Sequence, residues 1–205
     1  MGNVKKAMIL FNQMLKAGPF PTMVTYNTLI NGYLKLGNLN NALRLLEMMK
    51  ESGCDPDEWT YSKIISGFCK GGKLDFASTI FHEMVERGIS PNQVSYTAMI
   101  NGYSTEGRLD VTLSLFGKME ESGCYPSIET YNTIVRGLSK DNRFSEAEKL
   151  CNKLAEKGLL PNVITYTSFA EMVGLILHSR SSMKWKKEIA HQICTHILHS
   201  FMGYV

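Results

Sequence analysis

The chain has 205 residues, of which 44% are hydrophobic and 20% charged, a balance typical of a folded protein rather than a disordered one. The 22 Lys and Arg residues face 19 Asp and Glu residues, so the formal charge of +3 does not by itself indicate a nucleic-acid binder. Five cysteines without a CxxC pair favour free thiols in a reducing compartment. Apolar runs such as residues 7–11 are far shorter than the roughly 20 residues of a membrane span, and we expect neither a membrane segment nor a signal peptide.

An internal repeat of 35 residues is the dominant feature of the chain. Three residue types recur at this interval, five times each. They are Pro21, Pro56, Pro91, Pro126 and Pro161; Tyr26, Tyr61, Tyr96, Tyr131 and Tyr166; and Gly18, Gly53, Gly88, Gly123 and Gly158. A fixed period of this length predicts a repeat architecture.

The prolines divide the chain into units, each of which starts two residues after a proline. The predicted divisions are a partial repeat with only the second helix (1–22), repeat 1 (23–57), repeat 2 (58–92), repeat 3 (93–127), repeat 4 (128–162), the start of a fifth repeat (163–177) and a divergent C-terminal helix (178–205). Because Met1 falls inside a repeat, we expect the array to derive from a longer one.

Each unit has the pattern of two helices. In repeat 1 the apolar residues follow helical spacing from Tyr26 onward, and Thr25 is the expected N-cap. Gly37 and Gly53 are expected to end the first and second helices. Gly32 lies inside the first helix, where it costs about 1 kcal/mol relative to Ala, and its recurrence predicts close approach of neighbouring helices.

A unit of two helices cannot bury its own apolar face, whereas stacked units can. The predicted fold is all-α, a right-handed α-solenoid of stacked helix–turn–helix repeats of 35 residues. The recurring tyrosines and the methionines at 49, 84 and 119 are predicted to lie in its core.

The stretches 23–37 and 48–57 closely resemble the beginning and end of a pentatricopeptide repeat, and the resemblance extends over residues 1–167. The uniform period resembles the P subclass, which is common in plants. The resemblance implies sequence-selective binding of single-stranded RNA, one base per repeat, in organellar RNA processing, stability or translation. It also implies a mitochondrial or chloroplast location, although the chain contains no transit peptide.

In this family two residues of each repeat select the base: the one after the tyrosine and the one after the closing proline. Carried onto this chain, the pairs are Asn27 with Asp57, Ser62 with Asn92, Thr97 with Ser127, and Asn132 with Asn162. An ionised Asp only accepts hydrogen bonds, which suits uracil or guanine, whereas Asn or Ser can donate to adenine or cytosine. At the residue after the tyrosine the family associates Asn with pyrimidines and Ser or Thr with purines. The resemblance therefore implies the bases U, A, A or G, and C or U for repeats 1 to 4, with A favoured for repeat 3.

Two further sets of residues are implied by the resemblance. The residues that would flank bases are Val24, Trp59, Val94 and Ile164. The residues that would contact phosphates are Lys35, Lys70 and Lys140. Glu129 and Thr105 depart from these patterns and are expected to weaken repeats 3 and 4.

Two alternatives compete with the RNA-binding hypothesis. The polar residues in the first helical turns would also be ordinary solvated side chains in a protein-binding scaffold of the tetratricopeptide type, although that type has a period of 34 residues. An enzyme is not expected, because the zinc-binding signature of a deaminase and the P-loop are both missing.

The C-terminal segment has an apolar stripe from Trp185 to Phe201. It is predicted to cover the end of the solenoid, with a protein-partner surface or an altered gene product as alternatives. Four histidines gather there without a zinc-ligand spacing, so we expect no metal site and no cofactor. The protein is expected to be a monomer.

Overall fold

The computed structural model describes residues 2–159, 165 and 167. Asn162, Ile164 and the C-terminal segment 178–205 therefore lie outside the described residues. No helix of the described part of the chain is long and apolar enough to cross a bilayer.

All regular structure within the described residues is helical, which confirms the all-α prediction. The helices are α1 (Gly2–Ala17), α2 (Met23–Lys35), α3 (Leu39–Glu51), α4 (Glu58–Lys70), α5 (Leu74–Glu86), α6 (Gln93–Thr105), α7 (Leu109–Glu121), α8 (Ile128–Lys140) and α9 (Phe144–Glu156). From α2 onward each repeat has a first and a second helix, and each kind recurs every 35 residues. The first helices start at residues 23, 58, 93 and 128, and the second helices start at residues 39, 74, 109 and 144.

Glycine in the left-handed conformation ends α2 and α3 as predicted. Gly37 has φ 69° and Gly53 has φ 72°. Gly37 N–H donates to the carbonyl of Leu34 (3.0 Å), which satisfies one of the unpaired carbonyls at the end of α2. The predicted N-cap was wrong: α2 begins at Met23 and its N-cap is Thr22, whereas Thr25 lies in the first turn and accepts from Thr22 N–H at 3.3 Å.

The tyrosines and methionines of the repeat form the core. Tyr26, Tyr61 and Tyr131 are at most 1% exposed, Tyr96 is 6% exposed, and Met49, Met84 and Met119 are fully buried. Since the tyrosines point inward, the residue that follows each of them on the helix is turned toward a different face.

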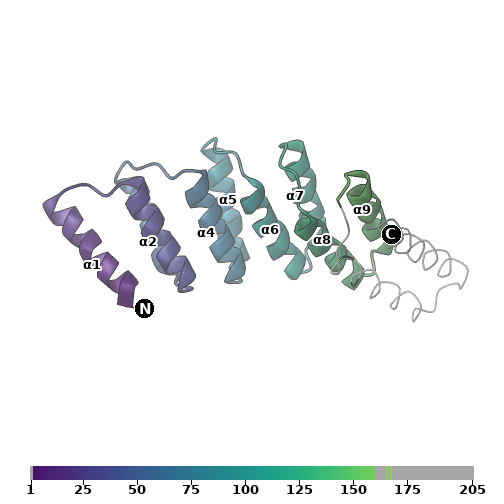
Figure 1. Ribbon diagram of the computed structural model, residues 1–205, viewed down its shortest axis with the longest axis horizontal. Coiled ribbons are helices and arrows are strands. Elements are labelled where there is room, and N and C mark those ends of the chain that lie inside the picture. The colour runs from purple at the N-terminus through teal and green to yellow at the C-terminus, as the bar shows by residue number, and fades with distance from the viewer. Residues whose placement is uncertain (1, 160–164, 166, 168–205) are drawn as a thin grey trace, which may run out of the picture. The chain divides into compact units, whose positions relative to one another are not determined.

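The chain forms two compact units, Met1–Tyr103 with Ser114–Tyr125, and Ser104–Leu113 with Pro126–Val205. In the first unit α2 packs against α3 and α4 against α5, and α2 also contacts α1 and α4. Figure 1 shows α1, α2 and α4 following one another in chain order. In the second unit α8 packs against α9. Within each unit the helix–turn–helix pairs are the building blocks of an α-solenoid.

The glycines inside the helices lie where side chains of the preceding repeat pack closely against the helix. A Cβ on Gly67 of α4 would lie 2.6 Å from Cδ2 of Leu34 in α2. A Cβ on Gly137 of α8 would lie 2.6 Å from Oγ of Ser104 and 2.7 Å from Cδ2 of Leu109. The predicted close approach is confirmed, and it explains why a residue that disfavours helix recurs within these helices.

A charged network joins repeats 1 and 2. Glu83 of α5 lies 2.6 Å from Nζ of Lys50 in α3 and 3.1 Å from Nε of Arg87, and it accepts from the Tyr61 hydroxyl at 2.7 Å. Burial alone raises the pKa of Glu83, but hydrogen bonds from Lys50 and Tyr61 and the charges of Lys50 and Arg87 outweigh it and hold that pKa below its ordinary value. The ionised carboxylate therefore stabilises the junction.

Alanine substitution tests the packing role of glycine. Gly137→Ala gains helix propensity of about 1 kcal/mol but forces two side chains to move, which typically costs about 1–3 kcal/mol, so we expect a net loss of stability. Gly117→Ala is the control, because Gly117 is inside α7 with nothing within 4 Å of its added Cβ, and it should stabilise by about 0.5–1 kcal/mol. Thermal unfolding followed by circular dichroism measures both. Equal stabilisation by the two variants would contradict the packing role.

The stability of the Glu83 network should depend on pH. Because the pKa of Glu83 is lower in the folded than in the unfolded state, its contribution is complete above the unfolded value of about 4.3 and is lost as pH falls through the folded value. Glu83→Gln should therefore destabilise by roughly 1.5 kcal/mol at pH 7 and by much less near pH 3. Unfolding midpoints over this range provide the measurement. Glu47→Gln serves as control, because Glu47 pairs with the same Lys50 but its side chain is 54% exposed, and its effect should be small at every pH.

Candidate nucleic-acid interface

In the part of the chain that the structure describes, the residue after each closing proline immediately precedes the first helix of the following repeat. Asp57 is the N-cap of α4, and its Oδ1 accepts from Thr60 N–H at 2.8 Å. Ser127 is the N-cap of α8 and accepts from Thr130 N–H at 3.4 Å. Asn92 immediately precedes α6, and its Oδ1 accepts from Ser95 N–H at 3.0 Å. A backbone donor therefore sets the orientation of each of these side chains.

In repeat 1 the two sequence-predicted residues share a polar cluster. The Thr60 hydroxyl lies 2.7 Å from Asn27 Oδ1 and 2.6 Å from Asp57 Oδ1, so it bridges the pair and donates its one hydrogen to either. Partial burial raises the pKa of Asp57, but hydrogen bonds from the Thr60 hydroxyl, the Thr60 backbone and the Asn27 side chain outweigh burial and keep the pKa below its ordinary value. Asp57 is therefore an ionised acceptor at neutral pH.

In repeat 2 the two predicted residues contact each other directly. The Ser62 hydroxyl donates to Asn92 Oδ1 at 3.0 Å, and Ser62 is 3% exposed. The amide nitrogen of Asn92 donates to Oε1 of Glu58, at 2.5 Å. The oxygen of this amide thus faces the protein and its nitrogen faces the exposed Glu58.

Repeat 4 repeats the arrangement of repeat 1. The buried hydroxyl of Thr165 donates to Asn132 Oδ1 at 2.7 Å, as Thr60 does to Asn27. Asn132 is 4% exposed. Its predicted partner Asn162 is outside the described residues. For repeat 3, Thr97 lies half-buried on α6 and Ser127 caps α8, and the two belong to separate compact units.

The three predicted base-flanking residues that the structure describes are exposed in the first turns of their helices. Val24 is 74% exposed, Trp59 41% and Val94 50%. Lys63 Nζ lies 5.4 Å from the centre of the Trp59 ring, a cation–π contact that holds the indole against α4. Exposed apolar groups beside polar clusters are suited to stacking on bases.

The three predicted phosphate-contacting lysines are the last residues of α2, α4 and α8, and all are exposed: Lys35, Lys70 and Lys140. A helix of 13 residues is roughly 18 Å long. The lysines therefore lie about that far along the helix from the N-capping residues. A cation at a helix C-terminus is also favourable without RNA, because it complements the helix dipole.

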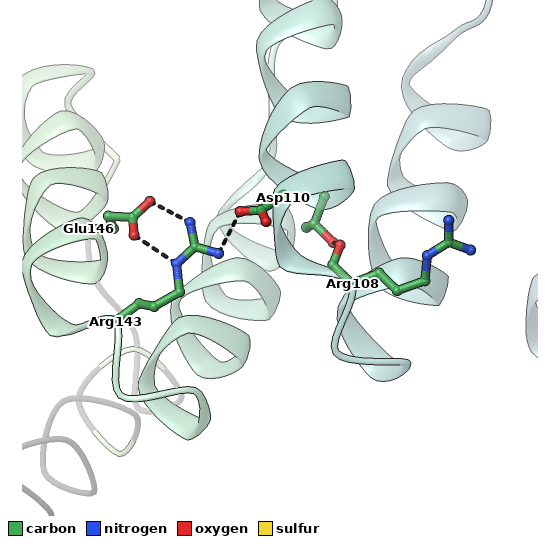
Figure 2. Close-up of polar contacts among 5 residues, drawn as sticks. Arg108, Asp110, Arg143 and Glu146 are labelled. Carbon is green, nitrogen blue, oxygen red and sulfur yellow. Dashed lines mark hydrogen bonds and ion pairs between the residues drawn. The ribbon is translucent and has the colours of Figure 1, made fainter.

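Arg143 lies between α8 and α9, and carboxylates already compensate its charge. Its guanidinium donates two hydrogen bonds to the Glu146 carboxylate, at 2.7 and 2.8 Å, and lies 2.7 Å from Oδ1 of Asp110. Figure 2 shows its guanidinium between the two carboxylates, with Arg108 to one side. The hydrogen bond from Arg143 lowers the pKa of Glu146. Near α8, Lys140 is therefore a better candidate for phosphate than Arg143.

Two kinds of residue were missed by the sequence analysis. One kind is the buried hydroxyl residues in one 35-residue register, each at most 1% exposed: Thr60, Ser95, Thr130 and Thr165. Of these, Thr60 and Thr165 donate to an Asn in the first helix of the preceding repeat. Their 35-residue register is visible in the sequence, but Thr25 was interpreted as a cap. Glu58 was also missed, because no other repeat has a carboxylate at that position.

The fold defines a helical-repeat protein in which polar clusters recur in repeats 1, 2 and 4. The sequence profile of the PPR repeat family matches residues 1–32, 21–70, 60–104, 91–140 and 126–172, and the chain belongs to this family. Among curated proteins none matches the chain significantly.

Solved structures of PPR proteins resemble the chain. The pentatricopeptide repeat protein PPR10 from maize is 27% identical with a TM-score of 0.69, over 97% of this chain and 27% of PPR10. PPR10 in complex with an 18-nt psaJ RNA element is 25% identical, with a TM-score of 0.58, over 95% of this chain and 31% of that one. The PPR domain of protein-only RNase P 1 from Arabidopsis thaliana, in complex with tRNA, has a TM-score of 0.73 at 18% identity, over 83% of this chain and 90% of that domain, and shows the fold alone. The chain thus spans less than a third of PPR10.

The capping role of Asp57 can be measured without RNA. Asp57→Ala removes the cap of α4 and should lower the free energy of unfolding by about 1 kcal/mol, whereas Asp57→Asn retains a capping oxygen and should cost only a few tenths. Asp55→Ala is the matched control, since it removes the same charge from an exposed neighbour. Chemical unfolding at pH 7 compares the three variants. Equal stability of Asp57→Ala and Asp55→Ala would show that the cap contributes nothing.

Proposed function

We propose that this chain binds single-stranded RNA in a sequence-selective manner, with one base per repeat, and that it has no catalytic role of its own. The expected core of the target is 5′-U-A-(A or G)-(C or U)-3′. The site comprises the pairs Asn27 with Asp57, Ser62 with Asn92, Thr97 with Ser127, and Asn132 with Asn162. We also propose that the protein acts in the processing, stability or translation of mitochondrial or chloroplast RNA. This second proposal is based on family membership alone.

One observation carries the proposal: in repeats 1 and 2 the two selecting residues meet in a single hydrogen-bonded cluster beside an exposed apolar side chain. Thr60 bridges Asn27 and Asp57, and Ser62 contacts Asn92. Solvated side chains without a role have no reason to be paired across 30 residues of sequence in this way. The PPR10 complex with RNA, a structure of the same family, supports the proposal.

The clusters leave hydrogen-bonding capacity for a base. An ionised carboxylate has about four acceptor sites, so Asp57 can accept from the imino N–H of uracil in addition to its contacts with Thr60 and Asn27. The amide of Asn92 has two N–H groups, of which Glu58 uses one. A cap that is already oriented loses little entropy when a base arrives.

Two accompanying proposals concern partners. We expect a monomer, and segment 178–205 remains a candidate surface for a protein partner. A tetratricopeptide-type scaffold is the rival function, and it predicts no preference among single-stranded RNAs.

Exchange of the repeat 1 residues should change the preferred base. The wild-type protein should prefer U opposite repeat 1. Asp57→Asn replaces an acceptor by an amide that can donate, so the preference should move to C, whose ring nitrogen carries no hydrogen. Asn27→Thr should move it to G, which keeps the imino N–H in a larger ring. Affinities for four RNAs that differ at this base measure the change, which should amount to about 1–3 kcal/mol.

Two controls accompany this experiment. Thermal unfolding shows whether each variant is folded, because Asn27 also contacts Thr60. Duplex RNA should compete poorly, and binding of the single strand should weaken as salt rises. If all three proteins rank the four RNAs alike, the pair Asn27 and Asp57 does not select the base.

A further inference from the structure

Glu58 is an exposed carboxylate inside the candidate interface. It is the first residue of α4 and precedes Trp59. The corresponding residues of repeats 1, 3 and 4 are Met23, Gln93 and Ile128, so only repeat 2 has a negative charge at this position among these four repeats. Its function is not explained by capping, because Asp57 already caps α4.

The contacts of Asn92 determine how its amide is presented. The oxygen accepts from Ser95 N–H and from the Ser62 hydroxyl, both at 3.0 Å. The nitrogen donates to Glu58 Oε1 at 2.5 Å. Since an amide nitrogen has two hydrogens, one N–H of Asn92 remains for a ligand, directly beside the carboxylate of Glu58. A donor and an acceptor are thereby placed side by side.

We propose that Glu58 is a specificity-determining residue of repeat 2 that selects bases in which an amino group lies next to a ring nitrogen without hydrogen; this inference rests on the proposed function. Adenine and cytosine present a bare ring nitrogen next to an amino group. The ring nitrogen accepts from Asn92 while the amino group donates to Glu58. Uracil and guanine present the opposite pattern, an imino N–H next to a carbonyl, so donor meets donor and acceptor meets acceptor.

The surroundings of Glu58 support a contact with a base. Trp59, the next residue, is 41% exposed and offers a face on which the base can stack. In repeat 3 the side chain at the equivalent position is used differently, because Gln93 Nε2 donates to the backbone carbonyl of Tyr125 at 3.1 Å. The effect of Glu58 should therefore be confined to repeat 2.

The test compares variants on RNAs that differ only at the base opposite repeat 2. The wild-type protein should bind the A and C forms better than the U and G forms. Glu58→Ala should reduce this ratio about tenfold, the size of the loss of one good contact to a base edge. Glu58→Gln retains an oxygen of the same reach but can also donate, so it should lower the ratio chiefly by improved binding of U and G.

Glu51→Ala is the matched control for charge. Glu51 is the exposed last residue of α3, and its loss changes the net charge by the same amount as Glu58→Ala. It should strengthen binding to all four RNAs by one common factor, because a negative charge that opposes phosphate has been removed. If Glu58→Ala has only this uniform effect, Glu58 acts through charge alone and the inference is overturned.

A second RNA series, varied opposite repeat 1, separates this inference from the proposed function. A wild-type protein that discriminates at neither position refutes the proposed function itself. Intact discrimination at repeat 1 together with an unchanged ranking at repeat 2 in Glu58→Ala refutes the role of Glu58 alone. Equal melting of wild type and Glu58→Gln excludes misfolding as the cause of any altered ranking.

Discussion

The hydrogen bond between a closing-position side chain and a backbone N–H of the next first helix is the interaction on which the candidate interface depends. A helix leaves its first N–H groups without partners, and Asp57, Asn92 and Ser127 each accept from one of them. This requirement restricts the position to short side chains with an acceptor oxygen. The same side chains are suited to the hydrogen-bonding edge of a base, so the residue type that helix initiation requires is also the type that the proposed base selection requires. The bond also orients each side chain before any ligand arrives.

A buried hydroxyl extends this interaction from one repeat to the next. Thr60 lies in the first turn of α4, yet its hydroxyl reaches Asn27 of the preceding repeat, and Thr165 reaches Asn132 in the same way. Because each hydroxyl is buried, leaving it without a partner would cost about 1–3 kcal/mol. The candidate base-selecting residues Asn27 and Asn132 are therefore held by a side chain of the following repeat, and a substitution at either position is expected to affect stability.

Close packing of the first helices keeps these clusters in register. Gly67 leaves room for Leu34, and Gly137 leaves room for Ser104 and Leu109. Between α2 and α4 a Cβ at position 67 would lie 2.6 Å from Cδ2 of Leu34, so that side chain would have to move. The tyrosine core lies next to these clusters, and the neighbouring residues Ser62 and Asn132 are themselves only 3% and 4% exposed. Packing and polar contacts thus impose the same spacing from repeat to repeat.

Much of this protein was determined by its sequence alone. Residues that recur every 35 positions predict the repeat period, the pairs of helices, the glycines that end helices, the buried tyrosines and the family. This is possible because local backbone preferences and apolar periodicity act within a single repeat. The cap was misplaced by three residues, since both Thr22 and Thr25 can initiate a helix and only the fold chooses between them. The bridge from Thr60 to Asn27 and the bond from Asn92 to Glu58 join residues more than 30 positions apart. Such contacts arise only when repeats stack, and they decide which polar atoms face the protein and which remain for a base.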